Sequence, residues 1–320
     1  MIKVTSQLPE NGNAYVLFGF EAIQARPNLD PYSSTLRMND ETGQVFTSDV
    51  HIKHHVRRGL KAYAASEKLP HAADTVFYEK EDEEGNACNF DLRLAKIRSA
   101  AGISAPGMKD ALYNTLDLPL FGYVHAVKNE NFNVTNAANT LFRPVTFHSC
   151  EIYSLGRNNA FPTLDKDEKV KESAGSATVD SLEYGFFLAL WEINLNMLRI
   201  NATNNALIDW KSGGAAKWLE VLVNGLWRAY SSDRFPSFTQ RSQFAQFVLG
   251  WLPTGDVSFA NPADIYDQLD DKLIKSHAAA VSALANVLPG FLGGWGCQGA
   301  NVFVKHQAAN FPVTLPGAEA

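Results

Sequence analysis

Residues 14–23 form a nearly continuous apolar run that contains three aromatic side chains. An apolar run of this length and aromatic content suits the interior of a sheet, so we expect a strand that is buried on both faces, or nearly so. Turn-forming residues follow at 26–34 and again at 39–43, where Gly43 can supply a positive φ. The chain therefore begins with a core strand and a long ordered loop.

A basic amphipathic helix is predicted over residues 49–65. Ser48 can cap its free amides, and Asp49 places negative charge at the positive end of the helix dipole. Apolar residues between 52 and 63 recur at spacings of four and three, which predicts one face packed on the sheet. The other faces carry three stripes, formed by Lys53, Arg57 and Lys61, by His54 and Arg58, and by His51 and His55.

The remaining pattern predicts strands and helices in irregular alternation, without an internal repeat. We expect a hairpin over 76–98, strands over 118–126, 143–152 and 244–252, a strand bending into a helix over 184–200, and helices over 215–230 and 262–288. The polar segment 153–181 fits a projecting arm or a mobile loop, and a glycine-rich loop at 289–299 precedes a short apolar stretch at 302–304. Four tryptophans are expected to be core residues, namely Trp191, Trp210, Trp218 and Trp227. The fold class is α+β.

Composition limits the functional classes. A net charge of −6 and an isoelectric point of about 5.8 argue against a surface coated in positive charge for duplex DNA, so any nucleic-acid site must be local. Three cysteines without CxxC spacing suggest neither a disulfide framework nor a zinc site, and they fit a reducing cytoplasm. With no secretory signal and no long apolar span, we expect a cytoplasmic protein without a membrane partner.

Residues 25–34, 40–43 and 48–58, read in order, resemble the opening of the CRISPR-associated RAMP family that forms the Cascade backbone. The shared order is a strand, an Asn-x-Asp-Pro loop, an acidic Thr-Gly turn and a Ser-Asp-Val that opens a basic helix. Weaker matches follow at 120–122, 142–145, 182–185 and 259–269. Leu29 and Arg143 stand where the family usually has glycine, which suggests a divergent subtype such as the type I-F variant or the type IV form.

The resemblance implies a ferredoxin-like or RRM-like palm with a β-rich thumb and helical insertions. Residues 1–150 would be the first part of the palm, 151–182 the thumb, and 183–320 the completion of the palm. It also implies a non-catalytic subunit that oligomerises along a guide RNA (crRNA). Expected partners are that guide, target DNA or RNA paired with it, further copies of the chain, the subunit capping the 5′ repeat tag, and a recruited effector nuclease. No cofactor is expected.

The candidate RNA-binding residues follow from the helix and the resemblance together. Cations one helical turn apart, about 5.4 Å, can each meet a backbone phosphate, although a solvated basic face is the plain alternative. His51 and His55 could instead bind metal, but no third ligand is apparent, and imidazoles hydrogen-bonding RNA or plain surface histidines fit better. The full set is Arg26, Asn28, Arg37, His51, Lys53, His54, His55, Arg57, Arg58, Lys61, Arg143, Arg157 and Asn158.

Asp30 raises an enzymatic alternative. Related RAMP subunits of type III complexes use an aspartate in the equivalent loop for metal-dependent cleavage of target RNA. An aspartate before proline is more often a turn residue, so no catalytic residue is expected. A metabolic enzyme with a chance match is the third alternative, and neither a nucleotide fingerprint nor a catalytic triad supports it.

Overall fold

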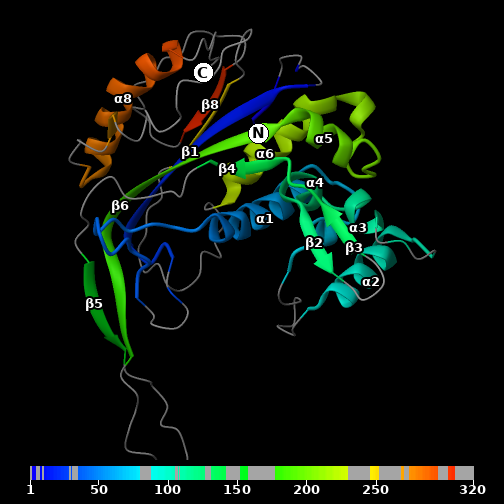
Figure 1. Ribbon diagram of the computed structural model, residues 1–320, viewed down its shortest axis with the longest axis horizontal. Helices are drawn as coiled ribbons and strands as arrows, with labels where there is room; N and C mark the ends of the chain where they lie inside the picture. The colour runs from blue at the N-terminus through cyan, green and yellow to red at the C-terminus, as the bar shows by residue number, and fades with distance from the viewer. Residues whose placement is uncertain are drawn as a thin grey trace, which may run out of the picture.

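The computed structural model gives the chain a mixed architecture of helices and antiparallel sheets, which confirms the α+β class (Figure 1). The structure describes residues 2–4, 8, 11–28, 30, 35–79, 88–104, 107, 109–126, 131–141, 152–157, 177–229, 246–251, 268–269, 274–294 and 302–306. Within this part, no helix combines the length and the hydrophobicity needed to span a lipid bilayer.

The main sheet is built around β1 (Asn13–Ala25), as the opening apolar run predicts. β1 pairs antiparallel with β6 (Ala177–Asn194) on one side and β7 (Gln246–Trp251) on the other. β8 (Val302–His306) extends the sheet beyond β7, while β4 (Ala138–Thr140) and β5 (Ile152–Arg157) both pair with β6. Residues 14–22 are all buried, so the expected burial of both faces of this strand is confirmed.

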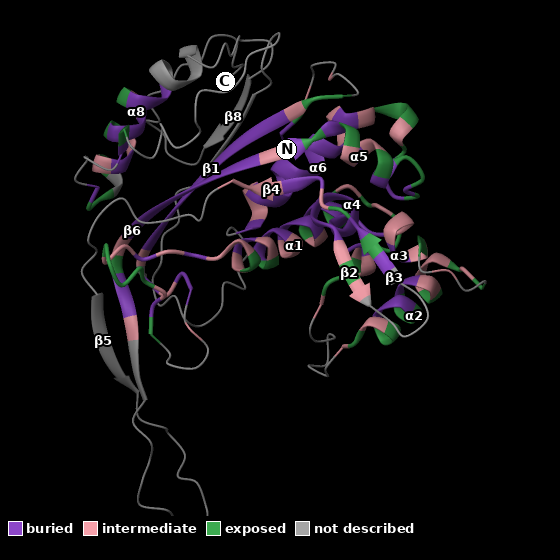
Figure 2. Cartoon of the chain, viewed as in Figure 1, coloured by how far each residue is buried: buried purple, intermediate pink, exposed green. Residues whose placement is uncertain are grey.

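Two helices cover one face of this sheet. α1 (Asp49–Ser66) and α6 (Gly214–Ala229) pack their apolar sides against alternate residues of β1 and β6, and Figure 2 shows this layer buried. The helical spacing predicted for residues 52–63 holds, because Ile52, Val56, Leu60 and Tyr63 all lie in this core. In Figure 1, α8 (His277–Gly294) lies on the other side of the sheet.

α1 and α6 touch through a pair of glycines. A Cβ built on Gly59 would overlap the carbonyl oxygen of Gly225, and a Cβ on Gly225 would lie 2.7 Å from a methyl carbon of Leu60. The two backbones are therefore closer than any larger residue permits. This contact fixes the position of α1 on the sheet and its rotation about its own axis.

A smaller unit packs beside α1. It consists of η1 (Ala72–Asp74), α2 (Phe90–Ala101), α3 (Lys109–Tyr113), α4 (Asp117–Phe121) and the hairpin of β2 (Tyr123–Ala126) with β3 (Asn131–Val134). Seven buried side chains form its own core, namely Phe77, Leu94, Ile97, Ala111, Leu118, Phe132 and Val134. This unit supplies the residues that meet the basic side of α1.

Two strand predictions in this unit are wrong. The expected hairpin over 76–98 is replaced by α2, because Asn89 caps a helix by accepting from the Leu92 amide, and Leu94 and Ile97 share its buried side. The expected strand over 118–126 is α4 followed by β2. Gly122, with φ of +66°, separates the two elements at a place where a Cβ would overlap the backbone of Val134.

The second half of the chain follows its sequence pattern more closely. The strand that bends into a helix is β6 continued by α5 (Leu195–Ala202), and the helix expected over 215–230 is α6. β7 confirms the strand expected over 244–252 for the described residues 246–251, and the short apolar stretch at 302–304 lies in β8. The short helix η2 (Trp210–Ser212) was not predicted. Trp191 and Trp218 are fully buried, while Trp210 and Trp227 pack partly buried against the same core.

The predicted loop at 289–299 is wrong over its first six residues, because α8 continues to Gly294. The helix expected over 262–288 is confirmed for the residues of α8, from 277 onward. Most of the strand expected over 143–152 lies outside the described residues, and β5 begins at Ile152. The part of β6 that pairs with β5 extends away from the helices as a two-stranded ribbon, in agreement with a projecting arm (Figure 1).

Replacing Gly59 with alanine should destabilise the fold by about 1–3 kcal/mol, because the added methyl group forces α1 and α6 apart. Helix propensity alone predicts the opposite sign, a gain of up to about 1 kcal/mol. Urea unfolding measures the difference. Ala62→Gly, at an exposed position inside the same helix, isolates propensity and should cost about 1 kcal/mol. A Gly59→Ala protein as stable as wild type would show that the contact does not limit the helix spacing.

Candidate nucleic-acid interface

The basic stripe of Lys53, Arg57 and Lys61 is engaged by carboxylates. Lys53 Nζ lies 2.6 Å from Asp49 Oδ2, one turn earlier in α1. Lys61 Nζ lies 2.6 Å from Glu79 Oε1, which belongs to the segment leading into the smaller unit. This stripe therefore faces protein carboxylates along its length.

Arg57 has the most enclosed of these partners. Its Nε donates to Oδ2 of Asp117 over 3.0 Å, and the carboxylate of Asp117 is fully buried. The same carboxylate accepts from the backbone amides of Phe77, at 2.7 Å, and Tyr78, at 3.0 Å. Three donors on one buried carboxylate join α1, the segment before α2 and α4 at a single point.

Aromatic rings enclose the Arg57 guanidinium as well. Its central carbon lies 4.8 Å from the ring centroid of Tyr78 and 5.3 Å from that of Phe121. Contacts of this kind add cation–π attraction to the ion pair. With its side chain only 12% exposed, Arg57 is built into the junction between the two units.

The predicted loop residues meet the start of α1. Asn28 is buried, and its Nδ2 donates over 3.2 Å to Ser48 Oγ, which in turn accepts from the His51 amide as the helix cap. The Arg37 amide donates to the Asn28 carbonyl over 3.2 Å, and the Arg37 carbonyl accepts from Phe46 over 2.9 Å. The loop that carries Arg37 is thereby fastened to the helix terminus.

The turn after Arg37 takes the conformation expected from its glycine. Gly43 has φ of +68°, and its amide donates to the Asn39 carbonyl over 2.8 Å. At the other end of the loop, Arg26 Nε donates to Ser181 Oγ over 2.9 Å, beside the point where β5 pairs with β6. The loop thus connects the base of the two-stranded ribbon to α1.

The histidines of α1 form a compact group. Nε2 of His51 and Nε2 of His55 lie 3.1 Å apart, so one ring donates to the other. The exposed ring of His54 meets that of His55 edge to face, with centroids 5.4 Å apart. His51 and His55 therefore act as one pair, with His54 beside it.

This group lies in positive surroundings. Burial, followed by the charges of His54 and Arg37, lowers the pKa of His51 to about 4. Burial, followed by the charges of His51, His54 and Arg58, lowers the pKa of His55 to about 2. Both rings are thus neutral at pH 7, and the positive charge here comes from the guanidinium groups of Arg37 and Arg58.

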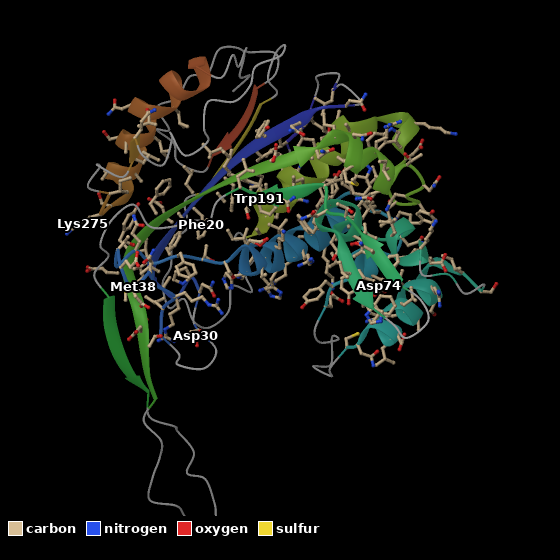
Figure 3. The ribbon with its side chains drawn as sticks, in the orientation of Figure 1. Phe20, Asp30, Met38, Asp74, Trp191 and Lys275 are labelled. Carbon is tan, nitrogen blue, oxygen red and sulfur yellow. The ribbon has the colours of Figure 1, made fainter. Side chains whose placement is uncertain are left out.

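The predicted residues separate into groups. Beside the first ten residues of α1 the structure gathers Asn28, Arg37, His51, His54, His55 and Arg58, whereas Lys53, Arg57 and Lys61 pair with carboxylates. Arg157 ends β5 on the ribbon, whereas Arg143 and Asn158 lie outside the described residues. Asp30, labelled in Figure 3, lies in the loop and donates its amide to the Thr35 carbonyl over 2.8 Å.

Two of the three carboxylate partners of the basic stripe follow no pattern in the sequence. Asp117 lies 60 residues after Arg57, and Glu79 lies 18 after Lys61, so no helical or strand period connects them. Glu79 also pairs with Arg93, whose Nη1 lies 2.8 Å from Asp74 Oδ1. The third partner, Asp49, lies four residues before Lys53, which is the spacing at which oppositely charged side chains pair on a helix.

Removing the charge of Asp117 should loosen this junction. Asp117→Asn leaves the Arg57 charge without its partner and turns an amide donor toward backbone donors, so we expect a loss of about 3 kcal/mol in unfolding free energy. Asp110→Ala, which removes a partly exposed partner of Arg98, should cost about 1 kcal/mol or less. Equal losses in chemical denaturation would contradict the role given to Asp117.

Comparison with solved structures finds one with a similar fold at a TM-score above 0.5. Two solved structures each share 12% identity with the chain. One, described as "CRISPR RNA-guided surveillance complex, pre-nicking", has a TM-score of 0.53 over 95% of this chain and 94% of that chain. The other, described as "CRISPR RNA-guided surveillance complex", has a TM-score of 0.49 over 95% and 93%. At this identity the first likeness concerns the fold alone.

Sequence comparison is more specific. No curated protein matches the sequence at a significant level. A family model described as "CRISPR-associated protein Cas7" matches residues 12–237, which is more than half of the 320 residues and includes β1, α1, β6 and α6. The chain therefore belongs to the Cas7 family of CRISPR-associated proteins.

Proposed function

We propose that this chain is a non-catalytic, crRNA-binding backbone subunit of a CRISPR surveillance complex, and that copies of it line up along the guide. Family membership supports the assignment, and the two similar structures are themselves described as RNA-guided complexes. The observation that carries it is the group of Arg37, Arg58 and the histidines of α1. It places local positive charge on a chain whose net charge is −6.

The chemistry of this group suits a phosphate backbone. Guanidinium groups bind phosphate oxygens in any sequence context, and imidazoles can donate to the same oxygens. Such contacts hold a guide irrespective of its bases, while base pairing with the target supplies specificity. Arg37, Arg58, His51 and His54 are our primary contacts, with Asn28 and His55 holding the loop and the ring pair in place.

The carboxylate-bound stripe has a different expected role. The carboxylate partners of Lys53 and Lys61 are partly exposed, Asp49 at 36% and Glu79 at 20%, so an RNA phosphate could compete with them for the two ammonium groups. If Arg57 left Asp117 to bind an RNA phosphate, the buried carboxylate of Asp117 would lose its cationic partner. We therefore propose Lys53 and Lys61 as additional phosphate contacts and Arg57 mainly as the residue that holds α1.

The same proposal extends to the domains. Residues 1–150 and 183–320 would form a ferredoxin-like palm, which the position of β1 between β6 and β7, with α1 and α6 on one face, supports. Residues 151–182 would be the thumb, with Arg157 and Asn158 reaching the next copy and interrupting the guide–target duplex. Arg26 would contact RNA at the base of the thumb, and Arg143 would contact it from the palm. The complex would also contain the subunit capping the 5′ repeat tag and recruit an effector nuclease to the DNA or RNA target.

Arg58→Ala tests the phosphate contact. It should weaken binding to unrelated guide sequences alike and lower the slope of log affinity against log salt by about 0.7, the value for one phosphate contact on single-stranded RNA. Fluorescence anisotropy at several salt concentrations measures both. Lys96→Ala removes one positive charge from exposed α2, outside the site, and should leave the slope unchanged. Identical behaviour of the two variants would contradict the assignment.

Asp30→Ala tests the absence of catalysis. The assembled complex, incubated with matched RNA and Mg²⁺, should leave the RNA intact both as wild type and as the variant. Gel analysis of end-labelled RNA provides the readout. Regularly spaced cuts that disappear in Asp30→Ala would instead identify a metal-dependent ribonuclease.

A further inference from the structure

Glu79 lies between two cations at the junction of α1 and the smaller unit. Its Oε1 is 2.6 Å from Lys61 Nζ, and its Oε2 is 3.2 Å from Nη2 of Arg93. We propose that Glu79 is an internal competitor of RNA, which a phosphate of the bound strand replaces at Lys61 while the carboxylate stays with Arg93. The inference rests on the proposed RNA-binding function and adds to it a residue that limits the affinity.

The position of Lys61 on α1 is the first argument. Lys61 follows Arg58 by three residues, and Arg58 follows His54 by four, so the three side chains are neighbours on the helix surface. The side chain of Lys61 is 30% exposed, and its ammonium ends a flexible stem that can turn from one oxygen to another. A strand that contacts His54 and Arg58 can therefore extend to Lys61.

The second argument is that buried Arg93 keeps Glu79 paired when Lys61 leaves. The Arg93 side chain is only 3% exposed, and Nη1 lies 2.8 Å from Asp74 Oδ1. Its Nε donates to the Val76 carbonyl over 3.1 Å, so the guanidinium is fixed independently of α1. Removing one partner of an ion pair is costly when it leaves a buried charge uncompensated. Glu79 avoids that cost, because Oε2 retains its guanidinium.

The charge balance of this network is the third argument. The ion pairs connect three cations, Lys61, Arg93 and Lys96, with two carboxylates, Glu79 and Asp74. These five groups together carry one positive charge in excess. One further anion is therefore attracted to them, and Lys61 is the cation of the three that lies on α1 beside Arg58.

The experiment measures the affinity of the full chain for short single-stranded RNAs of unrelated sequence, by fluorescence anisotropy at several salt concentrations. Glu79→Gln keeps the shape of the side chain and an oxygen for Arg93, but removes the charge that competes at Lys61. We expect the affinity to rise about two- to fivefold at low salt, the range for a partly exposed ion pair. Lys61→Ala should instead weaken binding and lower the salt slope by about 0.7.

Two controls separate competition from a general effect of charge. Asp74→Asn removes the same charge from the same network, but its carboxylate pairs with Arg93 and Lys96 instead of Lys61. It should bind RNA nearly as wild type does. Glu79→Gln combined with Lys61→Ala should bind like Lys61→Ala alone, because the two effects are coupled through one contact.

Two further points keep the comparison valid. Urea unfolding shows that each variant is folded before the affinities are compared. Four acidic residues occupy positions 81–84, outside the described residues, and their charge is the same in every variant. Their repulsion of RNA therefore cancels when the variants are compared with wild type.

Three results would overturn the inference. They are an affinity of Glu79→Gln equal to or below that of wild type, an equal rise in Asp74→Asn, and a rise that persists in the absence of Lys61. In each case a lower salt slope in Arg58→Ala would leave the proposed function intact. A wild-type chain that binds no RNA at any salt concentration would overturn both.

Discussion

The contact between Gly59 and Gly225 determines where α1 lies, and the candidate interface depends on that position. Without side chains at these two residues, the backbones of α1 and α6 approach closely, and Leu60 and Val56 pack around the contact. Helix rotation is then no longer free, because interiors are packed too densely to tolerate a shift of even a methyl group. The apolar side faces the sheet, and every charged stripe of the helix takes a defined direction.

Within the described part of the chain, some of the basic and imidazole side chains of α1 are paired with carboxylates, and others are not. Asp117 and Glu79 come from the smaller unit and take up Arg57 and Lys61, which joins that unit to the main sheet. No such carboxylate contributes to the lowered pKa values of His51 and His55, which reflect burial and positive neighbours. Among the described residues, one part of this basic helix is thus paired with protein carboxylates, and the part that carries the histidines is not. This difference is why we propose the histidine-bearing part as the RNA-binding surface.

Sequence patterns correctly predicted those helices and strands whose defining features, such as a cap or a hydrophobic period, lie within the element itself. The apolar run of β1, the capped and periodic α1, and the strand of β6 that continues into α5 are all of this kind. The two strand predictions failed where an apolar stretch was short enough to suit either a strand or a helix. Phe90 to Leu94 and Leu118 to Phe121 became helical because Asn89 caps one helix and the other ends at Gly122 against β3.

The sequence by itself determined a buried first strand, an amphipathic helix with separate basic and histidine stripes, and the order of motifs that resembles the family. These features are encoded in neighbouring residues, at the periods of strands and helices. Only the tertiary structure decided which stripe is neutralised, since the carboxylates that do so lie 18 and 60 residues away from their partners. It also brought Arg37 to the histidines through the Asn28–Ser48 contact, because contacts between distant segments depend on packing and leave no period in the sequence.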